Sequence, residues 1–159
     1  MRIKSILEEN MEIGNLITQE VADEGKWFGV ILYGKKQPFA IKIYGSDSDR
    51  VQKFQREQFK KLQENRKDLE EMSDEVIEQV LESNIDSVIV RIGGLKSIKW
   101  NKFGEGFEFI DEPVTMNGKT LKDDEASFRE LIDKIPAVKD FVNKKSNERT
   151  NFLADGKKN

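Results

Sequence analysis

The chain of 159 residues contains no cysteine and no histidine. These absences exclude disulfides, thiolate zinc sites, cysteine nucleophiles and every catalytic pair that needs a histidine base. No apolar run approaches the roughly 20 residues that cross a bilayer, and residues 1–10 carry Glu8 and Glu9, which does not fit a signal peptide. We therefore expect a soluble, cytoplasmic protein with no membrane partner.

A basic excess is also missing. Lys and Arg number 27 against 30 Asp and Glu, a net charge of −3, whereas surfaces that bind nucleic acid usually carry a clear positive excess. The densest basic run, residues 56–67, is interleaved with Glu57, Gln58 and Glu64. We interpret this run as the solvated face of a helix, and we expect no nucleic-acid partner.

Hydrophobic residues make up only 36% of the chain, and charged residues make up another 36%. This polar composition predicts one small core with large solvated faces. We expect a single α+β domain at 26–153, predominantly helical, with a small N-terminal antiparallel hairpin or sheet packed on amphipathic helices. A weakly structured arm should precede the domain at 1–25, and a disordered tail should follow it at 154–159.

The strand signal lies between residues 26 and 44. Residues 26–33 are aromatic and β-branched, 34–36 supply a turn, and Phe39, Ile41 and Ile43 recur at strand spacing. We place Pro38 at the start of the second strand, where proline is tolerated. Because two strands alone are marginal in water, this hairpin needs a cover for its apolar face.

We expect the next helix along the chain to be that cover. Residues 46–49 can cap a helix that we expect to run to about residue 71, with Val51 and Phe54 on its apolar face and Phe59 off to the side. A second apolar stripe runs over residues 76–92. We expect the glycine pair at 93–94 to end that second helix.

Residues 95–122 predict a connecting stretch, mostly a long surface loop. Phe107, Phe109 and Val114 could contribute extended structure to it, and Asn117-Gly118 is a turn signal. After this stretch, Asp123 or Asp124 begins a helix with an apolar stripe. Pro136 should end that helix and occupy the first turn of the next one, so we expect a C-terminal helical hairpin over 123–153.

No residue pattern predicts catalysis, a cofactor or a metal site. The acidic pairs at 8–9, 70–71 and 123–124 lie among polar residues, where nothing moves a carboxyl pKa toward neutral pH. Asp47 and Asp49 lack further ligands at calcium-loop spacing, and the string at 118–120 lacks the upstream glycine of a phosphate-binding loop. Trp27, Phe28 and Tyr33 could stack on bases if exposed, but we favour an anchoring role in the hairpin.

The order of short strings along the chain resembles the tail assembly chaperones of long-tailed (siphovirus-type) bacteriophages and prophages. The likeness covers roughly residues 20–153. The strings that carry it are Glu24-Gly25-Lys26-Trp27, Gly45-Ser46, Gly93-Gly94-Leu95, Glu112-Pro113-Val114, Phe128-Arg129-Glu130-Leu131-Ile132 and Arg149-Thr150-Asn151-Phe152, the last preceded by Phe141.

This resemblance implies a protein of the host bacterial cytoplasm that binds the phage tape measure protein and keeps it soluble. It also implies help for tail tube proteins that polymerise around that chain, and possible homo-oligomers. From this sequence alone we take five residues as candidates for partner contact: Phe141, Arg149, Asn151, Phe152 and Leu153. Alternatively, Phe141 and Phe152 close the core. Two other functions stay open, a structural tail or connector protein retained in the virion and a nucleic-acid-associated regulatory protein.

Overall fold

The computed structural model describes residues 13–64 and 84–154, and the chain is α+β with antiparallel sheets. Residues 84–89 form a helical segment ahead of the third strand. The other elements, in chain order, are η1 (Ile13–Leu16), α2 (Gln19–Glu24), β1 (Lys26–Leu32), β2 (Lys35–Ile43), α3 (Asp49–Glu64), β3 (Ile92–Trp100), β4 (Phe107–Phe109), β5 (Val114–Met116), β6 (Lys119–Leu121), α5 (Glu125–Lys134), α6 (Pro136–Asn147) and η2 (Arg149–Phe152).

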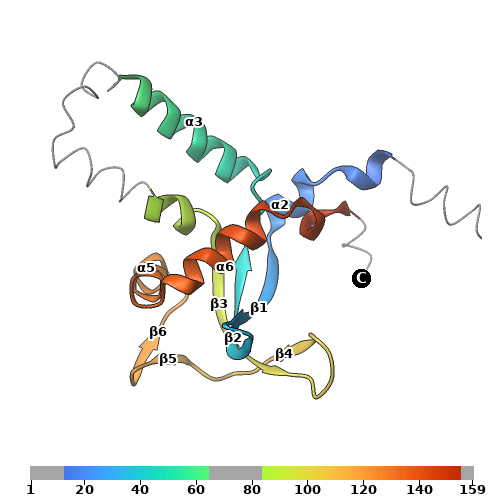
Figure 1. Ribbon diagram of the computed structural model, residues 1–159, viewed down its shortest axis with the longest axis vertical. Coiled ribbons are helices and arrows are strands. Elements are labelled where there is room, and N and C mark those ends of the chain that lie inside the picture. The colour runs from blue at the N-terminus through green and yellow to red at the C-terminus, as the bar shows by residue number, and fades with distance from the viewer. Residues whose placement is uncertain (1–12, 65–83, 155–159) are drawn as a thin grey trace, which may run out of the picture.

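The main sheet has the order β1-β2-β3-β4, with every neighbour antiparallel (Figure 1). The predicted hairpin at 26–43 forms its first two strands. Tyr33 and Gly34 make the turn with φ values of 54° and 74°, which is the two-residue turn whose twist matches that of the strands. Pro38 lies in an irregularity of the β1–β2 register rather than at the start of its strand, and its missing N–H is tolerated there.

The glycine pair at 93–94 was wrongly interpreted as a helix end. Both residues lie in β3, which pairs with β2. A Cβ on Gly94 would lie 2.6 Å from Cη2 of Trp27, and a Cβ on Gly93 would lie 2.6 Å from Cε2 of Tyr44. The glycines therefore let two aromatic rings lie close over the strand. The stripe residues at 76–83 lie outside the described residues.

The expected surface loop at 95–122 is also corrected, because most of it is strand. Residues 95–100 belong to β3, Phe107 and Phe109 lie in β4, and β5 and β6 form a separate small hairpin. The predicted turn is confirmed, since Asn117 and Gly118 have φ values of 53° and 80°. The sheet is therefore built from both the N-terminal hairpin and this middle region, not from the N-terminal residues alone.

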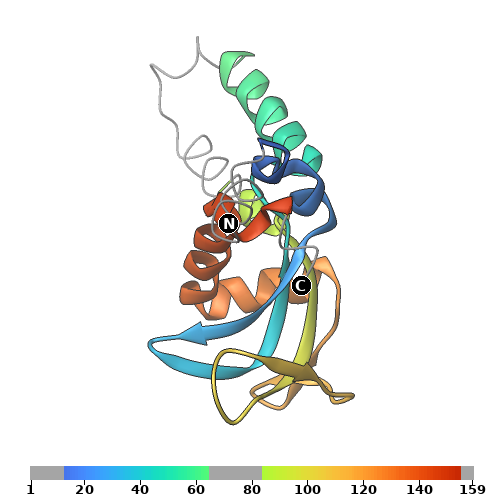
Figure 2. The ribbon, with the colours of Figure 1, turned by 90° about the vertical axis from the view of Figure 1, so that its right-hand side faces the viewer.

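The C-terminal helices share one core with the sheet. The predicted start of α5 is confirmed, because the Asp124 side chain accepts a hydrogen bond from the Ser127 N–H, and Pro136 begins α6 as expected. Figures 1 and 2 show both helices on one side of the sheet. The buried cluster joins strand residues to these helices: Val30, Leu32, Phe39, Ile41, Ile43, Val88, Ile92, Leu95, Leu121, Phe128, Leu131, Ile132, Val138 and Val142.

The expected cover by the helix after the hairpin is wrong for its described part. Val51 at the start of α3 is fully buried, but Phe59 is 62% exposed, and α3 extends away from the sheet (Figure 1). The apolar stripes of α5 and α6 pack on that face of the sheet instead. Residues 65–71 of the predicted helix lie outside the described residues.

The arm at 1–25 is not weakly structured throughout. Residues 19–24 form α2, whose Val21 and Ala22 are buried in a small cluster with Phe152. Residues 1–12 and the end of the expected tail, 155–159, lie outside the described part of the chain. Among the helices that the structure describes, none combines the length and apolarity needed to span a membrane.

Candidate functional site

An open groove of about 720 Å³ runs along the outer edge of β1. β1 is the end strand of its sheet, so that edge has no strand partner among the described residues. The groove reaches around both faces of the sheet and is lined by Lys26, Trp27, Phe28, Gly29, Ile31, Leu32, Tyr33, Trp100, Glu105, Phe107, Ala137, Asp140, Phe141, Lys144, Lys145 and Asn151.

One wall of the groove is formed by α6 and the core-facing side of β1. Phe28 and Phe141 supply its aromatic surface, and Phe141 is half-buried against the core. The Lys145 Nζ lies 5.7 Å from the centre of each of these two rings, and the Lys26 Nζ lies 5.8 Å from that of Phe28. This wall is therefore apolar and aromatic at its base, with ammonium groups above it.

The opposite wall is formed on the other face of the sheet. Trp100 and Phe107 pack edge to face with their ring centres 5.7 Å apart. A Cβ on Gly29 would lie 2.5 Å from Cη2 of Trp100, so this glycine lets the indole lie directly on β1. The Trp100 indole N–H donates a hydrogen bond to the Gln37 carbonyl at 2.7 Å, which fixes the ring's orientation.

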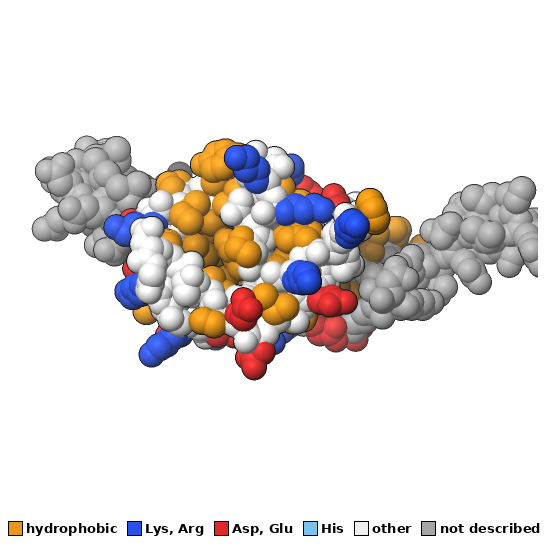
Figure 3. All heavy atoms as spheres, turned by 90° about the horizontal axis from the view of Figure 1, so that it is seen from below, with side chains coloured by type: hydrophobic (Ala, Val, Ile, Leu, Met, Phe, Trp, Pro, Cys, Tyr) orange, Lys and Arg blue, Asp and Glu red, His pale blue; other side chains and the backbone are white. Residues whose placement is uncertain are grey.

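The charges around the groove lean toward positive. The lining residues include three lysines and two carboxylates, Lys26, Lys144, Lys145, Glu105 and Asp140. None of the five belongs to an ion pair formed within the described residues. Lys144 and Lys145 lie in the last turn of α6, where the helix dipole favours cations. Seen from the end of the molecule shown in Figure 3, hydrophobic side chains gather in the middle, with both basic and acidic side chains around them.

The groups with shifted pKa values lie outside this groove and have structural roles. The Ser127 backbone N–H lowers the pKa of Asp124 at the start of α5, and burial lowers the pKa of Arg91. The Asp86 and Glu125 carboxylates raise the pKa of Arg129. Within the described ranges, no three acidic side chains gather as metal ligands.

Two of the five predicted contact residues line the groove. Phe141 and Asn151 line it, and the Asn151 side-chain amide donates a hydrogen bond to the Lys145 carbonyl at 3.1 Å. Leu153 is half-buried just beyond η2. No finding tests whether these residues contact a partner, so that role remains a prediction.

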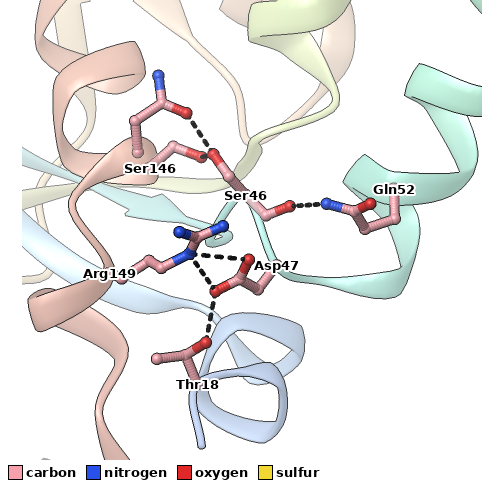
Figure 4. A network of polar contacts seen from close by, with 7 residues as sticks. Thr18, Ser46, Asp47, Gln52, Ser146 and Arg149 are labelled. Atoms are coloured by element: carbon pink, nitrogen blue, oxygen red, sulfur yellow. Dashed lines mark hydrogen bonds and ion pairs between the residues drawn. The ribbon is translucent and has the colours of Figure 1, made fainter. Parts of the chain in front are cut away.

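The other two, Phe152 and Arg149, are placed elsewhere. Phe152 is only 1% exposed and packs with Val21 and Ala22, so it closes the core, as the alternative interpretation had it. The Arg149 Nε donates to the Asp47 carboxylate at 3.0 Å, and the Thr18 hydroxyl donates to the same carboxylate (Figure 4). Arg149 thereby ties η2 to the loop between β2 and α3.

The same region holds a second set of polar contacts. The Gln52 side chain donates to the Ser46 carbonyl at 2.7 Å (Figure 4). The Ser146 hydroxyl donates to the Tyr44 carbonyl at 2.8 Å. These bonds connect α6, the β2–α3 loop and α3. The segment that supplies four of the five candidates for partner contact, residues 149–153, is therefore partly used to stabilise the fold.

Sequence reasoning missed most of the groove. Phe28 was interpreted as a hairpin anchor, Trp100 was placed in the connecting stretch, and Lys144 and Lys145 were not considered. Phe107 was expected to be able to contribute extended structure, but not to lie beside β1. One usable signal was present. Alternation along β1 puts Trp27, Gly29 and Ile31 on one face and Phe28 on the other, so both faces of this strand carry aromatic residues.

Comparison with known proteins gives no match to any family model, any curated protein or any solved structure.

Proposed function

We propose that this chain is a non-enzymatic protein-binding factor of phage tail assembly, a chaperone that binds the tape measure protein and promotes tail tube assembly. The observation that carries this proposal is the groove at β1, an unpaired sheet edge between two aromatic walls. The order of sequence strings described above supports the phage assignment. The groove supports binding of a polypeptide segment.

The properties of the groove suit a partner that is itself aggregation-prone. A protein that shields another chain must expose apolar surface and yet stay soluble, and charges of both signs around that surface achieve this. Here the aromatic side chains at the base of the groove are bordered by Lys26, Lys144, Lys145 and Asp140 along the α6 wall and by Glu105 on the other side. Apolar side chains of a partner can be buried at the base while the rim stays hydrated.

The experiment is co-expression of the full chain with the tape measure protein of the same phage or prophage. We expect the tape measure protein to be largely insoluble alone, and soluble and co-purifying with a tag on this chain when both are expressed. Analysis of purified virions completes the test, since a chaperone should be absent from them. A tape measure protein that never co-purifies, or a chain retained in the virion, would refute the proposal, and the second result would favour a structural tail protein.

A further inference from the structure

We propose that the partner segment binds as an added β-strand on the free edge of β1, with acidic side chains directed toward α6. This inference rests on the proposed function and specifies how the same groove would be used. The occupant is an extended stretch of the partner chain whose side chains alternate between apolar residues and residues that include Asp or Glu.

The backbone of β1 leaves its outer hydrogen-bonding groups free. In a two-residue hairpin the pair flanking the turn exchanges hydrogen bonds, and here that pair is Leu32 and Lys35. Because successive residues of a strand direct their N–H and C=O groups to opposite edges, those of Trp27, Gly29 and Ile31 point away from β2. Within the described part of the chain, no backbone group outside the sheet bonds to them.

Edge strands of soluble proteins are usually blocked against such pairing, by short length, by proline, by charged side chains or by a covering segment. β1 has seven residues with a single charged side chain, Lys26 at its start, and no proline. The described residues supply no covering segment, since the groove lies open along this edge. An open strand of this length is the feature that strand addition by a peptide requires.

The two walls match the side chains of an added strand. Such a strand directs alternate side chains to opposite faces of the sheet. One set would meet Phe28, Ala137 and Phe141 at the base of the α6 wall, and the other would meet Trp100 and Phe107. A groove that followed only one face of β1 would fit a helix, whereas this groove receives side chains on both faces.

The positive charge of the α6 wall predicts that the bound segment carries acidic side chains. Lys26, Lys144 and Lys145 line the α6 wall, and Asp140 is the one carboxylate there among the lining residues. Because the three ammonium groups have no ion-pair partner within the described residues, an Asp or Glu of the added strand can approach them. Electrostatic matching of this kind fixes register and speeds association.

The test uses hydrogen exchange on the complex of the full chain with the tape measure protein. We expect the amides of Trp27, Gly29 and Ile31 to exchange more slowly in the complex, because each would donate to the added strand. Two variants at one position sharpen the result. Ile31→Pro removes an outward N–H and should weaken binding about tenfold or more, whereas Ile31→Ala keeps that N–H and should weaken it less.

A charge series gives a second readout. Lys144→Glu should weaken binding and reduce its salt dependence, whereas Lys60→Glu on the exposed face of α3 should leave both unchanged. Circular dichroism checks that each variant is folded, and the exchange measurement on the unaltered chain needs no variant.

The outcomes separate the two proposals. If the tape measure protein binds but the β1 amides stay unprotected and Ile31→Pro binds like Ile31→Ala, strand addition is wrong while the chaperone function stands. If the tape measure protein does not bind at all, both proposals fall. If the chain alone forms a dimer that protects the β1 amides and excludes the partner, the occupant is a second copy and the inference is overturned.

Discussion

Phe152 stabilises the fold at the point where the two ends of the described chain meet. Its ring is buried with Val21 and Ala22 and packs edge to face with Phe28, 6.2 Å between ring centres. A Cβ on Gly45 would lie 2.6 Å from that of Ala22 and 3.0 Å from the Phe152 ring, so the cluster is tightly packed. Removing the ring would leave a cavity that this packing cannot easily close.

Phe152→Ala should lower the free energy of unfolding by about 3–5 kcal/mol, the usual cost of truncating a buried phenylalanine. Leu153→Ala, at a half-buried neighbour, should cost about 1 kcal/mol. Urea unfolding of both variants measures the difference. Equal losses would mean that Phe152 is not part of the core.

Asp47 stabilises the fold through its charge. The hydrogen bond from Thr18 is the largest cause that lowers its pKa below the usual 3.8, and the bond and charge of Arg149 act in the same direction against a partial burial. The unfolded state therefore binds a proton more readily than the folded state. The stabilisation is present above pH 3.8 and is lost as pH falls through the lower folded-state pKa.

Asp47→Asn should cost about 1 kcal/mol at neutral pH, because Arg149 is largely exposed and its ion pair is screened. The difference from the unaltered chain should shrink as the pH falls below 3.8. Thermal unfolding across this pH range checks both points, with Asp111→Asn at an exposed site as the control. A difference that is independent of pH would exclude the charge as the cause.

At the scale of elements, the glycines of β3 decide where the aromatic rings lie. Trp27 lies over Gly94, and Tyr44 lies over Gly93. A side chain at either glycine would displace a ring and disturb the pairing of β3 with β2. This arrangement is a property of two strands together, so it depends on residues far apart in the chain.

Gly94→Ala should destabilise the protein by about 1–3 kcal/mol, because the new methyl group would lie 2.6 Å from the Trp27 ring. In a Trp27→Ala background the same substitution should cost less than about 1 kcal/mol. A double-mutant cycle by urea unfolding measures this coupling. If the destabilisation of the double variant equals the sum for the two single variants, the Trp27 ring does not constrain position 94.

The elements that sequence reasoning predicted well are those defined by local signals. The Asp124 cap, Pro136 at the start of α6 and the Asn117-Gly118 turn each depend on residues within one turn of chain. β3 was missed because its two glycines make room for the rings of Trp27 and Tyr44. These rings lie far away in the sequence, so the residues around the glycines do not reveal the contact. Phe107, Phe109 and Val114 were expected to be able to contribute extended structure, and they lie in β4 and β5. The bounds and pairing of β4, β5 and β6 were not predicted, because three-residue strands carry almost no period.

The candidate site was harder to predict for the same reason. Phe141 and Asn151 were chosen from the last helical segment, and they do line the groove. The opposite wall comes from residues around 100–107, whose contact with β1 depends on the whole sheet. The sequence could not show whether Phe152 is buried or exposed. The residues that bury it belong to α2, which lies outside the expected domain.

At the scale of the whole molecule, α5 and α6 cover one face of the sheet and α3 projects away (Figures 1 and 2). The groove at β1 lies beside α6, while Phe59 on α3 is 62% exposed at a different place on the molecule. The chain thus offers two phenylalanines that reach the surface, half-buried Phe141 and exposed Phe59, and only Phe141 lies in the proposed binding surface. Replacement of each by glutamate separates groove binding from general surface hydrophobicity.

The most direct test is the affinity of the full chain for the tape measure protein, measured by calorimetry for the unaltered chain, Phe141→Glu and Phe59→Glu. Thermal unfolding first establishes that all three are folded. We predict that Phe141→Glu weakens binding at least about tenfold, since a charge would be placed among the groove's aromatic side chains, and that Phe59→Glu binds like the unaltered chain. Equal affinity of all three proteins, or no binding by the unaltered chain, would contradict the account.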